Sequence, residues 1–264
     1  MSNFMKISLE SIKKLVEDAK KESKNLGDII NPILQKYTLE KKEILEVCQI
    51  GKFIYNLNCQ ISIIEKPSPP RPDFIIKYDS KLVGLEHTRI FSENAGNFNR
   101  VNSIIEYSEE VYKSMFPNDK VHAIISVEDD NIVYKQIEKK KIAVEIARYV
   151  NSVKNGLFIE KPFYIKNIKT TIHSKISFSY DEKNWQSDYL TKERLEKEIN
   201  KKENKIFLYK KDEKEISEYW LVLFIGSLSS ASYELNENED YKLPSKFDRV
   251  YLVADFDSKI VRVN

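Results

Sequence analysis

The segment that most constrains the fold of this chain reads PRPDFIIKYDSKLVGLEHTRI and covers residues 70–90. Residues 74–76 form a short apolar run of the β type, and a second such run begins at Leu82. The polar residues between the two runs favour a turn. A turn centred on Asp79 and Ser80 predicts an antiparallel hairpin in which residue i pairs with residue 159 − i, because 79 and 80 sum to 159.

This register brings two carboxylates together, because it pairs Asp73 with Glu86. Directly opposed residues of an antiparallel pair have Cβ atoms about 4.5–5.5 Å apart. Two carboxylates at that separation repel each other unless a cation lies between them or one is protonated. Since side chains alternate between the faces of a strand, Thr88 shares the face of Glu86, while His87 and Arg89 point to the other face. The hairpin therefore predicts a divalent-metal site.

The composition of the chain argues against several classes of function. With 43 Lys and Arg against 41 Asp and Glu, the formal net charge is +2, so any surface that binds nucleic acid must be locally basic. No run approaches the roughly 18 apolar residues of a membrane span, and we expect no membrane association. The six glycines form no phosphate-binding or dinucleotide-binding fingerprint, and the three histidines lack the spacing of a zinc site.

The cysteines and the N-terminal residues indicate the cellular compartment. Cys48 and Cys59 have no metal-ligand neighbours in the sequence, and two reduced thiols are typical of a reducing environment. The first residues lack the continuous apolar run of a signal peptide. We therefore expect a cytoplasmic protein.

Hydrophobic periodicity predicts an α/β protein. Helices are expected over about residues 8–25, 39–57, 100–115, 134–153 and 191–205. Strands are expected over residues 60–65, 121–127, 219–225 and 249–254, with two more between 161 and 180. No repeat or linker divides the chain, so we expect a single α/β domain over residues 1–264. Trp185 lies in a polar stretch, where we expect it to be exposed and able to contact a partner.

The order helix, strand, hairpin, helix, strand over residues 39–127, together with Pro72, Asp73 and Glu86, resembles the PD-(D/E)XK nuclease superfamily. The residues that carry the resemblance are the Pro-Asp pair and the acidic residue of the second half-motif. The resemblance implies a restriction-endonuclease-like core, a mixed sheet flanked by helices in αβββαβ order, over about residues 39–128. Additional helices and strands would then occupy about residues 129–264.

The resemblance also implies a function, a metal-dependent nuclease that hydrolyses DNA phosphodiester bonds. Asp73 and Glu86 would bind Mg²⁺ or Mn²⁺, with the backbone carbonyl of His87 as a third ligand. Magnesium prefers oxygen ligands and retains several waters, so such a set is sufficient. Many members carry a further Glu on the preceding helix, for which Glu46 is the better candidate and Glu43 the alternative.

One residue departs from the family pattern, because Thr88 stands where the superfamily has a lysine. A threonine hydroxyl can orient the nucleophilic water but supplies no positive charge. Either Thr88 is sufficient, or a cation comes from elsewhere in the chain, or catalysis is lost. The cations that sequence reasoning leaves open are Lys77, Arg71, Arg89 and, on the charged helix, Lys201, Lys202 and Lys205.

Two alternatives to a DNA nuclease follow from the same residues. The missing lysine favours a catalytically inactive nuclease-fold module with a binding or regulatory role, whereas the retained carboxylate pair opposes it. An RNA-cleaving nuclease is the other alternative. Superfamily members that cut both strands often dimerise, so a homodimer is among the expected partner states.

Overall fold

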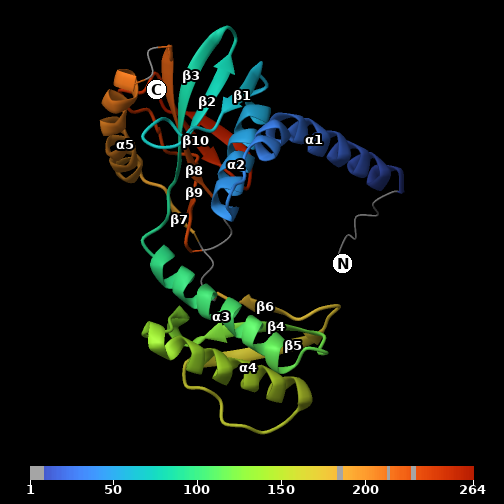
Figure 1. Ribbon diagram of the computed structural model, residues 1–264. Coiled ribbons are helices and arrows are strands. Elements are labelled where there is room, and N and C mark those ends of the chain that lie inside the picture. The colour runs from blue at the N-terminus through green and yellow to red at the C-terminus, as the bar shows by residue number, and fades with distance from the viewer. Residues whose placement is uncertain (1–8, 183–186, 213–214, 227–229) are drawn as a thin grey trace. The chain divides into compact units, whose positions relative to one another are not determined.

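A computed structural model describes residues 9–182, 187–212, 215–226 and 230–264. The chain forms two compact units (Figure 1). Unit 1 comprises Met1–Ile90, Leu190–Gly226 and Glu234–Asn264, and unit 2 comprises Phe91–Tyr189 and Ser227–Tyr233. In the sequence, the larger segment of unit 2 follows β3, and its short second segment follows Gly226 of unit 1.

Unit 1 contains a six-stranded mixed sheet. In spatial order its strands are β1 (Ile61–Glu65), β2 (Phe74–Tyr78), β3 (Lys81–Arg89), β8 (Glu218–Ile225), β10 (Arg249–Ala254) and β11 (Lys259–Arg262). The first three strands form an antiparallel meander, and β10 pairs antiparallel with β11. Strand β8 runs parallel to both of its neighbours. The near-continuous apolar run of β8 is explained by its central position, where both faces are buried.

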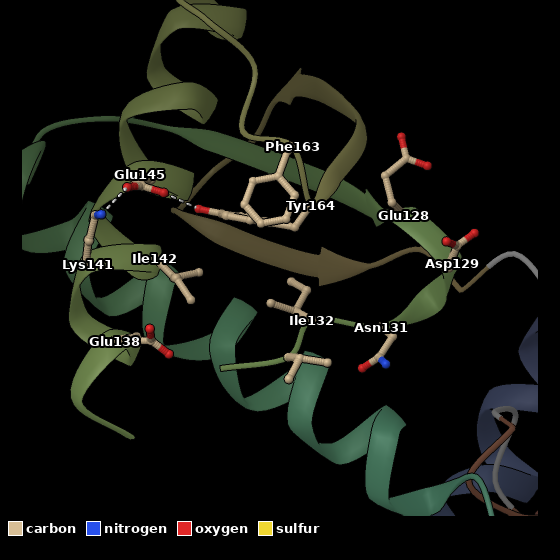
Figure 2. A pocket seen from close by; sticks show the side chains of 11 residues that line it. Glu128, Asp129, Asn131, Ile132, Glu138, Lys141, Ile142, Glu145, Phe163 and Tyr164 are labelled. Atoms are coloured by element: carbon tan, nitrogen blue, oxygen red, sulfur yellow. Dashed lines mark hydrogen bonds and ion pairs between the residues drawn. The ribbon is translucent and has the colours of Figure 1, made fainter. Parts of the chain in front are cut away.

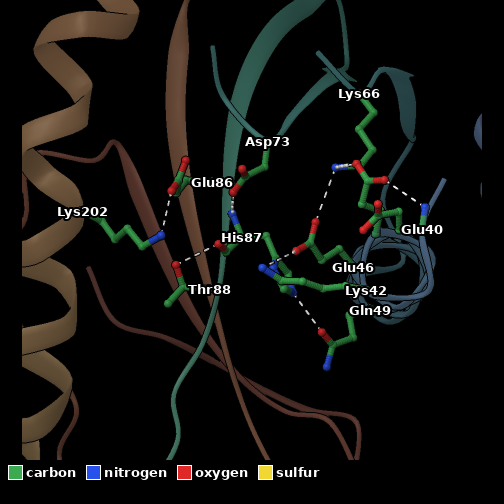
Figure 3. Close-up of polar contacts among 11 residues, drawn as sticks. Glu40, Lys42, Glu46, Gln49, Lys66, Asp73, Glu86, His87, Thr88 and Lys202 are labelled. Atoms are coloured by element: carbon green, nitrogen blue, oxygen red, sulfur yellow. Dashed lines mark hydrogen bonds and ion pairs between the residues drawn. The ribbon is translucent and has the colours of Figure 1, made fainter. Parts of the chain in front are cut away.

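Helices cover both faces of this sheet. Helices α1 (Leu9–Lys36) and α2 (Lys41–Leu57) contribute to one hydrophobic core with the sheet, and the C-cap of α2 is Asn58, which adopts the left-handed conformation at φ 50°. Helix α5 (Lys192–Asp212) lies on the other side of β3 (Figures 1 and 3). Each face of the central strands therefore has its own set of helix neighbours.

The hairpin register predicted from the sequence is confirmed. Phe74 pairs with Leu85 and Tyr78 pairs with Lys81, so each pair sums to 159 as expected. Asp79 lies in the turn with φ 53°. An Asp tolerates this left-handed conformation better than most residues do, which is why the Asp-Ser pair can close the hairpin.

Unit 2 has a separate sheet and a separate core. Its three strands lie in the order β5 (Ile165–Ile172), β4 (Val121–Val127) and β6 (Ser177–Tyr180). Helices α3 (Ala95–Met115) and α4 (Lys139–Asn155) share a hydrophobic core with this sheet. Two short 3₁₀ helices, η1 (Glu128–Asp130) and η2 (Gln136–Glu138), precede α4, and the short strands β7 (Asp188–Tyr189) and β9 (Tyr233–Glu234) pair with each other.

This division bears on two expectations from the sequence. The chain forms two compact units where a single domain was expected. The expected nuclease-like core over residues 39–128 includes elements of both units, because α3 and β4 belong to unit 2, where both contribute to its hydrophobic core. The helix and the strand that join the hairpin in unit 1 are α5 and β8.

Three further features of the sequence are Trp185, the absence of a long apolar run and the C-terminal residues. Trp185 lies outside the described residues. Within the part of the chain that the structure describes, no helix combines the length and the apolar character that crossing a membrane requires. Strand β11 was not expected from the sequence, because its four residues include two basic ones at the end of the chain.

Gly84 allows the start of β2 to approach β3 closely. A Cβ atom on Gly84 would lie 2.9 Å from Cγ of Pro72 and 3.0 Å from the ring of Tyr219. Both neighbours are themselves held in the sheet region, so Gly84→Ala should lower the free energy of unfolding by about 1–3 kcal/mol through overpacking. Urea unfolding measures the loss. The matched control is Gly96→Ala, where a Cβ meets nothing within 4 Å, and equal losses in both variants would contradict the close-packing argument.

Candidate functional site

Asp73 lies immediately before β2, at the end of the hairpin. Its Oδ2 accepts a hydrogen bond from the backbone N–H of His87 at 2.8 Å. Extending the observed register by one step places Asp73 opposite Glu86, as the sequence predicted. The Asp73 carboxylate is therefore held against β3 at the position next to Glu86.

Glu86 is a buried carboxylate with three donors. The residue is 1% exposed and lies in the middle of β3. Its Oε1 accepts hydrogen bonds from Nζ of Lys202 at 2.9 Å and from Nζ of Lys205 at 2.6 Å. Its Oε2 accepts a hydrogen bond from the hydroxyl of Tyr209 at 2.6 Å. All three donors come from α5, and Figure 3 shows Lys202 reaching toward Glu86 from that helix.

The two carboxylates have opposite electrostatic environments. Burial, followed by repulsion from Glu86, raises the pKa of Asp73 to about 6, although the His87 N–H acts in the other direction. Burial acts to raise the pKa of Glu86 as well, but attraction to Lys202 and hydrogen bonds from Lys205 and Tyr209 outweigh it and lower that pKa. Glu86 is therefore ionised at neutral pH, while Asp73 binds a proton more readily than an ordinary Asp does.

Thr88 and His87 occupy the faces that strand alternation predicted, and Figure 3 shows them on β3. The hydroxyl of Thr88 donates to the backbone carbonyl of His87 at 2.8 Å. That carbonyl is the oxygen expected to bind a metal, and it retains a second lone pair. The hydroxyl hydrogen of Thr88 is therefore engaged with this carbonyl, and the role of Thr88 in orienting a water stays a prediction.

The His87 side chain takes part in a polar network on the α2 side of β3. Its Nε2 lies 2.9 Å from Oε1 of Gln49, whose Nε2 donates to Asp255 at 2.7 Å. Lys52 also donates to Asp255. Burial, reinforced by repulsion from Arg89, lowers the pKa of His87 to about 3, so this imidazole is neutral and has a structural role in the network.

Glu46 does not join the carboxylate pair. It lies on α2, and its carboxylate faces Nζ of Lys66 at 3.4 Å and Nζ of Lys42 at 4.0 Å (Figure 3). Glu43, the alternative, lies 3.8 Å from Lys66 and accepts the backbone N–H of Glu40. Among the described residues no three Asp, Glu, His or Cys side chains form a group suited to a metal.

The basic residues that the sequence left open as a replacement for the motif lysine differ in the carboxylates that they contact. Lys202 and Lys205 contact Glu86. Lys201, one residue away, pairs instead with Glu198 at 2.7 Å, and Arg71 pairs with Glu65 at 2.8 Å. Lys77 is exposed on β2.

The sequence analysis does not predict the contact between Tyr209 and Glu86, although the spacing of Tyr209 from two lysines indicates it. Lys202, Lys205 and Tyr209 are spaced i, i+3 and i+7, which places them on one face of a helix. A tyrosine in line with two lysines on a charged helix is a candidate to contact a buried carboxylate. The partner itself lies more than a hundred residues earlier in the chain, so the spacing does not identify it.

Unit 2 contains a cavity of about 630 Å³ between η1, α4 and the start of β5 (Figure 2). The carboxylates of Glu128, Asp129, Glu138 and Glu145 line it, with Lys141 the single basic residue. Glu145 accepts a hydrogen bond from the Tyr164 hydroxyl at 2.6 Å. An excess of carboxylates repels phosphate groups, so this cavity is not a site for nucleic acid.

Comparison of the chain with protein-family models, with curated protein sequences and with solved structures yields no match.

The raised pKa of Asp73 has a measurable consequence for stability. Because its folded-state pKa of about 6 exceeds its ordinary value of 3.8, protonation favours the folded state, and this contribution to stability is lost as the pH rises through about 6. Asp73→Asn keeps an acceptor for the His87 N–H but does not titrate. We expect the variant to match the unsubstituted protein near pH 4 and to be more stable by about 1–3 kcal/mol near pH 8.

Urea unfolding at several pH values in the presence of EDTA measures this difference. The matched control is Asp240→Asn, an exposed residue in unit 1, whose effect should not change over the same range. If the change in the free energy of unfolding caused by Asp73→Asn is the same at every pH, as for the control, Asp73 has an ordinary pKa.

Proposed function

We propose that this chain is a metal-dependent nuclease that hydrolyses DNA phosphodiester bonds at the Asp73–Glu86 pair. The observation that carries the proposal is the combination of two adjacent carboxylates with two ammonium groups, those of Lys202 and Lys205, in one cluster around the buried Glu86. Carboxylates attract a divalent cation, and ammonium groups attract a phosphate. Phosphodiester hydrolysis requires both.

The topology of unit 1 supports the proposal. Elements α2, β1, β2, β3, α5 and β8 follow the αβββαβ order of the restriction-endonuclease-like core, with β8 parallel to β3. The segment Phe91–Tyr189 of unit 2 then corresponds to an insertion between β3 and α5. In this arrangement the Pro-Asp pair begins the second strand and the Glu lies in the third, as the superfamily pattern requires.

The residues of the pair fit a hard divalent cation. Oδ1 of Asp73 accepts no hydrogen bond from the described residues, and repulsion between Asp73 and Glu86 is relieved by a cation. Asp73, Glu86 and the His87 carbonyl would hold Mg²⁺ or Mn²⁺, both of which favour such oxygen ligands. When bound, the ion would act as a Lewis acid toward water and toward the phosphate oxygens.

Lys202 and Lys205 replace the missing motif lysine in this proposal. Their ammonium groups bind Oε1 of Glu86, so they supply positive charge at the carboxylate that precedes Thr88 by two residues. As positively charged donors they bind and orient a phosphate oxygen or the attacking water. Helix α5 also carries eight basic and five acidic residues, so it supplies the local positive surface that the net charge of the whole chain does not.

The proposal is tested by incubating the full-length protein with single- and double-stranded DNA and RNA in Mg²⁺, Mn²⁺ or EDTA. We expect cleavage of DNA that depends on the metal. Asp73→Asn and Glu86→Gln should each lower the rate at least about 100-fold, because each removes a metal ligand. The matched control is Glu237→Gln, an exposed residue paired with Lys259, whose rate should not change.

A non-catalytic module of the same fold is the second candidate function. One observation favours it, because both oxygens of Glu86 already accept hydrogen bonds from α5. Binding of DNA without cleavage under every metal condition would identify this module and refute the nuclease. Cleavage of RNA alone would change the substrate class and leave the site assignment intact.

The role of the α5 lysines is tested separately. Lys202→Met and Lys205→Met together should lower the rate of cleavage about 100-fold or more, because both positive charges next to the reacting phosphate are lost. Lys201→Met is the matched control, since Lys201 lies on the same helix but pairs with Glu198. Equal effects of the control and the double variant would show that α5 contributes only its general charge.

A further inference from the structure

The three donors that contact Glu86 are divided by charge between its two oxygens. Both ammonium groups, from Lys202 and Lys205, bind Oε1. The neutral hydroxyl of Tyr209 binds Oε2. One oxygen of the carboxylate therefore receives all of the positive charge, and the other oxygen has a neutral partner.

The donors also differ in how easily they can move. The side chains of Lys202 and Lys205 are 23% and 43% exposed, so solvent is available to each ammonium group when it leaves Glu86. Tyr209 is only 3% exposed, and its ring stacks on that of Tyr219 with the centroids 6.0 Å apart and the planes inclined by 19°. The hydroxyl on Oε2 is therefore fixed, whereas the two lysines on Oε1 are replaceable.

We propose that Tyr209 is a positioning residue that holds Glu86 by Oε2, so that Oε1 alone is presented to a divalent cation. The cation takes the place of Lys202 and Lys205 on that oxygen. This inference rests on the proposed function, and it adds which oxygen of Glu86 binds the metal and which residue aims it. A fixed second oxygen reduces the rotational freedom that Glu86 would otherwise lose on binding a cation.

Metal affinity tests the role of Tyr209 without relying on catalysis. Titration of Mn²⁺ into the full-length protein, followed by calorimetry or by the electron paramagnetic resonance of free Mn²⁺, gives a dissociation constant for each variant. Tyr209→Phe should weaken Mn²⁺ binding about 10-fold, the lower end of the effect of residues that orient metal ligands. Tyr164→Phe is the matched control, because Tyr164 also donates to a carboxylate at 2.6 Å, but in unit 2, and its Mn²⁺ affinity should be unchanged.

Removing a lysine should strengthen Mn²⁺ binding, whereas removing the Tyr209 hydroxyl should weaken it. The two measurements therefore distinguish a competing cation from a positioning residue. Lys205→Met removes a competing cation from Oε1 and should strengthen Mn²⁺ binding at least about threefold. This measurement also decides the matter if Tyr209→Phe fails to fold, because unchanged or weaker binding by Lys205→Met would overturn the replacement of lysines by the cation.

The remaining outcomes distinguish the inference from the function on which it rests. If the unsubstituted protein binds Mn²⁺ and cleaves DNA, but Tyr209→Phe binds Mn²⁺ equally well, the role of Tyr209 is refuted and the nuclease stands. If the unsubstituted protein neither binds Mn²⁺ at millimolar concentration nor cleaves nucleic acid, the proposed function fails and this inference fails with it.

Discussion

Unit 1 depends on how the charge of Glu86 is compensated inside the protein. An ionised carboxylate that is 1% exposed would cost several kcal/mol if it had no partner. The ammonium groups of Lys202 and Lys205 and the hydroxyl of Tyr209 compensate it, and each lies more than a hundred residues further along the chain. The packing of α5 on the sheet and the electrostatics of the candidate site are therefore linked, since the same three side chains contribute to both.

The carboxylate of Asp73 lies in a different electrostatic environment from that of Glu86, and the two pKa values shift in opposite directions. The pKa of Asp73 is raised by burial and by repulsion from Glu86, with one backbone N–H acting in the other direction, whereas two ammonium groups and a hydroxyl lower the pKa of Glu86. Pairs of carboxyl groups whose environments separate their pKa values are a recurring arrangement in active sites. Here the more easily protonated member would release its proton on binding a divalent cation, so metal affinity should be coupled to pH.

The parts of the fold that depend on neighbouring residues could be predicted from the sequence, and those that depend on distant ones could not. The turn at Asp79 set the register that places Asp73 beside Glu86, and strand alternation separated Thr88 from His87 correctly. The sequence does not identify α5 as the helix that contacts Glu86, because a helix and a strand also follow the hairpin directly, in unit 2. Nothing in local periodicity distinguishes an inserted unit from the continuation of a core. Glu46 is a second case in which the partner could not be predicted. Helix spacing shows that Glu46 lies on α2, but not that its carboxylate faces Lys66.

A sequence motif specifies where a charged residue stands in the chain, whereas the chemistry requires only where its charge lies in space. Thr88 breaks the motif, yet two ammonium groups reach the neighbouring carboxylate from α5. Asp73 and Glu86, when both are ionised, carry a formal charge of −2, which the two lysines balance. With a divalent cation bound, the same groups would carry about +2, and the lysines would be repelled from the metal toward any anion nearby. A phosphodiester is such an anion, so under the proposed function the displaced lysines would favour substrate binding only after the metal has bound. The order of binding would then follow from charge balance alone.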